Sequence, residues 1–66
     1  MMNLSVTILG KLDPARTSWF EGLEIMTGET TTLLTGQVPD QTALFGILNR
    51  FRDLGLLLLE VKVSQV

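Results

Sequence analysis

The chain of 66 residues contains no cysteine, no histidine and no tyrosine. Without cysteine, it forms no disulfide and offers no thiolate to a metal ion. Without histidine, it lacks both the commonest metal ligand and the side chain that most often acts as a general base near neutral pH. These absences exclude the usual ways in which a small protein is cross-linked or catalyses a reaction.

The chain also has no large excess of positive or negative charge and no long apolar run. Five basic residues are scattered along a chain of net charge −2, which argues against a nucleic-acid binder, because such proteins neutralise phosphates. The longest apolar stretch, residues 54–59, contains Gly55 and is too short to cross a bilayer. The first residues lack the positively charged start of a signal peptide. We therefore expect a cytoplasmic protein whose partner is neither a membrane nor a nucleic acid.

The composition is otherwise that of a folded protein, because 45% of the residues are apolar. The length allows a single domain over residues 1–66. A domain of this size buries only about 60% of its unfolded surface and is marginally stable alone. Small chains without a disulfide or a metal often gain stability by association, so the composition favours an oligomer.

The clearest local pattern runs over residues 38–63. Asp40 is a candidate N-cap, and Gly55 is placed to end a helix in the left-handed conformation. Between them, apolar residues recur every three or four positions, as in a helix with one buried side. An alternating strand pattern follows from Leu57 to Val63. The apolar stripe consists of Ala43, Leu44, Ile47, Leu48, Phe51 and Leu54.

Three further strands and a short helix precede this unit. Alternation of apolar and polar residues predicts strands over residues 3–12, 23–27 and 31–38. Asp13 and Pro14 predict the start of a helix of about two turns, which reaches Glu21. We expect its two aromatic residues, Trp19 and Phe20, to anchor it to the sheet.

This order of elements predicts the fold class α+β. Specifically, we expect a ferredoxin-like βαββαβ fold with a short first helix and a four-stranded antiparallel sheet of order 4-1-3-2. Both helices would then lie on one face of the sheet. The alternative is a meander with a single packed helix, if the first helix is a loop.

Three segments carry a resemblance to a family of small bacterial proteins that are uncharacterised. The segments are KLDPARTSWFEGLEI, TTLLTGQVPDQTALFGILN and RFRDLGLLLLEVKV. In that family the corresponding patterns are L-D-P, W-F-x-G-L, L-x-G-x-V-x-D-Q-x-A-L-x-G-x-L and R-D-L-G-L-x-L-L. The resemblance spans roughly residues 10–63 and implies no activity, so it assigns no functional residue.

The polar residues predict no catalytic or metal site. Asp13 and Asp40 are explained as helix caps, and Glu60 beside Lys62 reads as a solvated pair on a strand. No histidine is present to activate a serine or threonine, and the remaining carboxylates do not converge in the predicted fold. We therefore expect no enzyme activity, no cofactor and no metal.

The sheet face opposite the helices is the predicted interaction surface. Leu9, Met26, Leu33 and Leu58 fall on this outer face among threonines. Together they make a patch of about a few hundred Å², near the size at which an apolar patch indicates a partner, and the alternative is that they are scattered surface residues without a role. Phe45 and Arg52, on the flank of the long helix, form a second candidate contact. We expect a self-associating interaction module, a homodimer through the outer face or an edge strand. Another protein partner is also possible.

A small-ligand-binding regulatory domain of the ACT type is the alternative. Such domains share the βαββαβ order and bind amino acids near the loop between the first strand and the first helix, here residues 10–14. Fold analogy alone does not establish a function, so this reading rests on position only.

If the outer face forms the interface, Leu9→Asp or Leu33→Asp places a charge in it and yields a soluble monomer. Sedimentation velocity at tens of micromolar measures this change. An unaltered protein that is already monomeric at that concentration contradicts the prediction.

Overall fold

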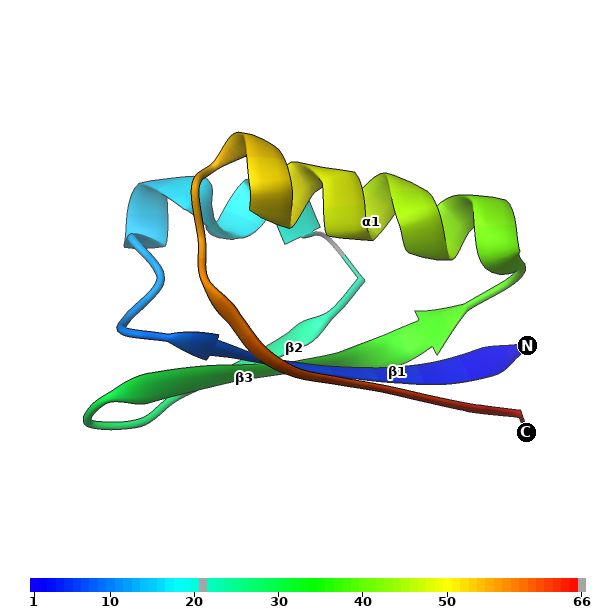
Figure 1. The fold of residues 1–66 in the computed structure, drawn as a ribbon, viewed down its shortest axis with the longest axis horizontal. Helices are drawn as coiled ribbons and strands as arrows, with labels where there is room; N and C mark the ends of the chain where they lie inside the picture. Colours follow the sequence, from blue (N-terminus) through cyan, green and yellow to red (C-terminus); the bar gives the residue numbers. More distant parts are fainter. Residues whose placement is uncertain (21, 66) are drawn as a thin grey trace.

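The computed structural model describes residues 1–20 and 22–65 and contains a single four-stranded sheet. The strands lie in the order β2-β3-β1-β4, and every neighbouring pair is antiparallel. The 3₁₀-helix η1 and the helix α1 lie on the same face of the sheet (Figure 1). The elements are β1 (Met2–Leu9), η1 (Pro14–Phe20), β2 (Glu24–Thr27), β3 (Thr31–Val38), α1 (Gln41–Asp53) and β4 (Leu58–Gln65).

This arrangement is a mixed α and β fold, and the predicted strand order 4-1-3-2 is confirmed. The meander is wrong, because β1 lies between β3 and β4. The ferredoxin-like βαββαβ succession is not matched, since the single α-helix of the described residues follows three strands. The predicted first helix is a 3₁₀-helix of seven residues, too short to gain much from α-helical propagation. Its expected last residue, Glu21, lies outside the described residues.

Both predicted ends of α1 are confirmed. The Asp40 carboxylate accepts a hydrogen bond from the Ala43 backbone N–H at 2.8 Å, which satisfies a donor left free at the helix start. At the other end Gly55 adopts φ +71°. The N–H groups of Gly55 and Leu56 donate to the carbonyls of Arg52 and Phe51 at 3.0 and 3.1 Å. This pair of bonds is a Schellman motif.

Two stacked aromatic rings join the helices over the sheet. Phe20 of η1 and Phe51 of α1 are buried, with ring centroids 4.5 Å apart and planes inclined by 23°. The Arg50 guanidinium adds a hydrogen bond to the Trp19 carbonyl at 2.7 Å. The anchoring role is thus confirmed for Phe20 and wrong for Trp19, whose ring is exposed. The buried apolar core is Leu4, Val6, Ile8, Leu12, Phe20, Leu34, Val38, Leu44 and Phe51.

A β-bulge changes the register between β1 and β4. Thr7 pairs with Glu60, but Ile8 pairs with Leu58, so Leu59 is an extra residue on β4. Residues that pair directly share a face of the sheet. Leu58 therefore belongs with the buried Ile8 on the helix side, not on the outer face where alternation alone had placed it.

Two glycines of the last αβ unit should respond oppositely to alanine. Gly46→Ala lies inside α1, where an added Cβ meets nothing within 4 Å, and should stabilise the fold by about 0.5–1 kcal/mol. Gly55→Ala forces a Cβ into the left-handed region and should destabilise it by about 1–2 kcal/mol. Urea unfolding measures both changes. A destabilised Gly46→Ala variant or an unaffected Gly55→Ala variant would contradict these assignments.

Candidate functional site

Two of the acidic side chains, Asp13 and Asp40, are explained by the fold itself. Asp13 accepts the Ala15 N–H at 3.0 Å, much as Asp40 caps α1. Within residues 1–20 and 22–65, no three acidic, histidine or cysteine side chains gather in a group that could hold a metal ion. None of the helices in the described ranges has the length and apolar character needed to cross a bilayer.

The loop over residues 10–14, the predicted position for an ACT-type ligand, is committed to internal contacts. The Gly10 N–H donates to the Thr30 carbonyl at 2.7 Å, and the Gly10 carbonyl accepts from the Thr32 hydroxyl at 2.8 Å. Leu12 is buried in the core. The backbone groups of Gly10 are therefore occupied, and a ligand there would have to displace these bonds.

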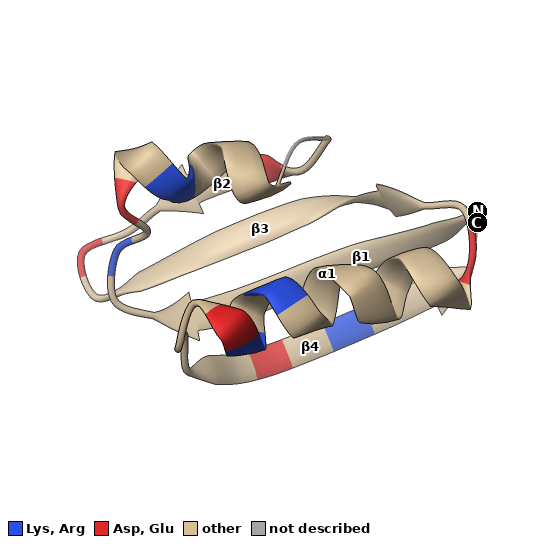
Figure 2. Ribbon diagram, turned by 90° about the horizontal axis from the view of Figure 1, so that it is seen from above, with Lys and Arg blue, Asp and Glu red and all other residues tan. Residues whose placement is uncertain are grey.

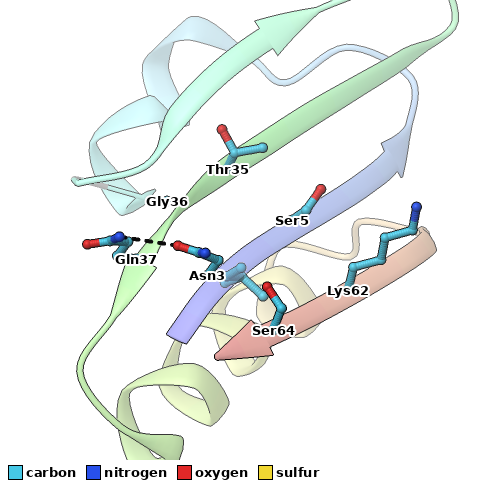
Figure 3. Close-up of a pocket in the computed structure, with 8 residues that line it drawn as sticks. Asn3, Ser5, Thr35, Gly36, Gln37, Lys62 and Ser64 are labelled. Atoms are coloured by element: carbon cyan, nitrogen blue, oxygen red, sulfur yellow. Dashed lines mark hydrogen bonds between the residues drawn. The ribbon is translucent and has the colours of Figure 1, made fainter. Parts of the chain in front are cut away.

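A shallow hollow of about 410 Å³ lies on the outer face (Figure 3), and most of the surface that it exposes belongs to carbon atoms of otherwise polar residues. Lys62 supplies its single charge, and the Asn3 amide oxygen accepts a hydrogen bond from the Gln37 amide at 3.2 Å. Hydroxyls, amides and one ammonium can hold a small polar molecule, but they include no activated nucleophile or base. The lining residues are Asn3, Leu4, Ser5, Thr35, Gly36, Gln37, Lys62 and Ser64.

Three of the predicted outer-face residues gather at the other end of that face. Met26 on β2 pairs directly with Leu33 on β3. Leu9 lies on β1 two residues beyond Thr7, which is the β1 residue that pairs with Leu33. Leu57 takes the place expected for Leu58, since its carbonyl accepts the Leu9 N–H at 3.0 Å. Apart from this cluster the outer face is polar, so its apolar patch is smaller than the alternation suggested.

The second surface named from the sequence was an edge strand, but the sequence did not indicate how exposed the edge strand β4 is. All eight of its residues are exposed. Val61 and Val63 pair with the buried Val6 and Leu4, so they point toward the helix side. They nevertheless remain 39% and 43% exposed, where the alternating pattern predicted a covered inner face. Among the described residues β4 is an edge strand that pairs with β1 alone, so its other side presents a row of N–H and C=O groups without strand partners.

The flank of α1 carrying Phe45 extends this apolar surface. Arg50 faces η1, because it binds the Trp19 carbonyl. Phe45 lies five residues earlier and therefore about 140° around the helix, on the side turned away from η1, where β4 lies (Figure 2). Its side chain is 54% exposed. Arg52, seven residues after Phe45, shares this flank and pairs with Asp53 at 3.3 Å.

Two opposite charges mark the outer side of β4. Glu60 and Lys62 form an ion pair at 3.5 Å, with side chains 56% and 70% exposed. They are seen as the red and blue bands on β4 in Figure 2. An exposed pair of this kind contributes little to stability, so its effect on the monomer is small.

The family model described as "Domain of unknown function (DUF8691)" matches residues 3–62. This match confirms the predicted membership of an uncharacterised family of small proteins. No curated protein and no solved structure matches the chain.

Proposed function

The chain belongs to the DUF8691 family, and we propose that it is a self-associating interaction module without catalytic activity. Its homodimer forms through the edge strand β4. The observation that carries this proposal is the exposure of all eight residues of β4, including the inward-pointing Val61 and Val63. The bacterial cytoplasm remains the predicted setting.

Of the two edges of the sheet, β4 is the better suited to pairing with a strand of another chain. The opposite edge, β2, has four residues, whereas β4 has eight. A strand of a second copy pairs the free backbone groups of β4 and covers Val61, Val63 and the Phe45 flank. A few hundred Å² of apolar surface, at about 25 cal/mol per Å², contributes several kcal/mol per copy before the costs of association.

We also propose that the fold is a reduced ferredoxin-like arrangement. The strand order 4-1-3-2, the antiparallel neighbours and the placement of η1 between β1 and β2 support this relation. In this view, η1 takes the place of the first α-helix. The open edge of β4 is then a normal feature of the topology, available for pairing.

Val61→Lys tests the interface, because a lysine in the middle of an edge strand opposes pairing with another strand. Met26→Lys is the matched control, since Met26 is exposed on β2 at the opposite edge. In sedimentation velocity we expect a dimer for the unaltered protein and for Met26→Lys, and a monomer for Val61→Lys. Circular dichroism should show both variants folded.

The Leu9→Asp variant separates the two possible interfaces. It remains dimeric if β4 forms the contact and becomes monomeric if the outer face does. A monomeric unaltered protein, or a Val61→Lys variant that stays dimeric, would rule out self-association through β4.

The hollow on the outer face supports a second candidate function, a small-ligand-binding regulatory domain of the ACT-like type. Hydroxyl and amide side chains line it together with Lys62, which suits a small polar molecule. This site differs from the loop position that the analogy to ACT-type domains predicts, because that loop is occupied by its own hydrogen bonds.

A thermal-shift screen against amino acids and nucleotides tests this second function. Binding in the hollow should raise the melting temperature, and Thr35→Val should abolish the rise because Thr35 lines the hollow. Thr31→Val, on the same face of the same strand but outside the hollow, should retain it. A flat screen would leave the interaction module as the function.

A further inference from the structure

We propose that the partner strand is β4 of a second copy, paired antiparallel about a two-fold axis at Val61. In this register Glu60 of each copy faces Lys62 of the other. The inference rests on the proposed self-association and adds its geometry. In this arrangement Glu60 and Lys62 favour a second copy of the chain as the partner and determine the register of the two strands.

Symmetry restricts the possible registers. Two antiparallel strands are related side by side by a two-fold axis perpendicular to the sheet, so the residue at the axis lies opposite its own copy. Residues on either side then pair in reverse order, and paired residues share a face. With both copies in one continuous sheet, all helices lie on the same face.

The charges distinguish between the central registers. An axis at Glu60 places two carboxylates directly opposite each other, and an axis at Lys62 does the same with two ammonium groups. Both arrangements are destabilising, because like charges directly across a strand pair repel. An axis at Val61 instead makes two Glu60–Lys62 pairs on the outer side and a valine pair on the helix side.

Registers further along the strand lose this complementarity. An axis at Leu59 places Glu60 opposite Leu58, and an axis at Val63 places Lys62 opposite Ser64. Each leaves a charge facing an uncharged residue. The Val61 register is therefore the one in which charge pairing and apolar pairing coincide.

The existing ion pair extends into a network in this register. Glu60 and Lys62 are already 3.5 Å apart within one chain, so four charges of alternating sign cross the outer side of the paired strands. Exposed ion pairs add little affinity but discriminate strongly against like-charged partners. The apolar residues drive association, while the charges select the register.

A charge exchange tests the register. Glu60→Lys or Lys62→Glu alone places like charges opposite each other twice, and each should raise the dimer dissociation constant at least tenfold. The double variant Glu60→Lys/Lys62→Glu restores opposite charges and should return within about threefold of the unaltered value. Equimolar Glu60→Lys and Lys62→Glu chains should form a heterodimer. Glu24→Lys, exposed on β2 at the opposite edge, is the control and should dimerise unchanged.

Cross-linking gives a second readout that does not depend on charge. The chain has no cysteine, so Val61→Cys introduces a single thiol opposite its own copy, within reach of a disulfide. Mild oxidation should yield a covalent dimer. Val63→Cys should not, because its own copy lies four residues away, about 13 Å along the strand.

The outcomes separate the two proposals. If the unaltered protein is monomeric in sedimentation, self-association itself fails. If it is a dimer that ignores the single charge reversals, or that the double variant does not restore, the register is wrong while self-association stands. Preferential cross-linking of Val63→Cys over Val61→Cys would also overturn the register.

Discussion

The stacked rings of Phe20 and Phe51 are the contact on which the rest of the structure depends. They are fully buried and join η1 to α1, with the Arg50–Trp19 hydrogen bond beside them. Beneath the two helices, the inner residues of β1 and β3 supply most of the remaining core. Every buried apolar residue among those described comes from β1, β3, η1, α1 or the loop after β1. The core is therefore complete without β4, which is held chiefly by backbone pairing with β1.

Because β4 adds no residue to the buried core, its free edge differs from the rest of the sheet in how much it can gain from association. The backbone groups on the free side of β4 bond to water, and exchanging water for a second strand gains little net energy per hydrogen bond. Val61, Val63 and Phe45 are different, because half-covered apolar surface gains from any further burial. In a chain this small, where the core alone gives a marginal fold, burial at an edge is a substantial addition. The free energy that would favour association at this edge therefore comes from burying these side chains, while the backbone hydrogen bonds would fix how the two strands align.

The parts of the fold that followed from the sequence have local causes. Asp40 caps a helix through a bond three residues away, and Gly55 ends it through bonds within the same turn. The position of Leu58 depends instead on the bulge at Leu59, which exists only because β4 pairs with β1. A shift of one residue moves side chains to the other face, and no signal within residues 57–59 reveals it. The exposure of β4 likewise depends on where α1 rests across the sheet, which the helix's own sequence does not specify.

The two candidate functions are coupled, because Lys62 belongs to both surfaces. Lys62 lines the hollow and, on the proposed pairing, its ammonium group faces Glu60 of a second copy. An anionic molecule in the hollow would compete with that carboxylate for the same cation and so weaken the dimer. By linkage, dimer formation would weaken binding of the anion by the same factor. A neutral polar molecule held by Ser5 and Thr35 makes no such demand on Lys62 and leaves the dimer unchanged. On these two proposals, the charge of a ligand, more than its size, determines whether its binding in the hollow changes the stability of the dimer.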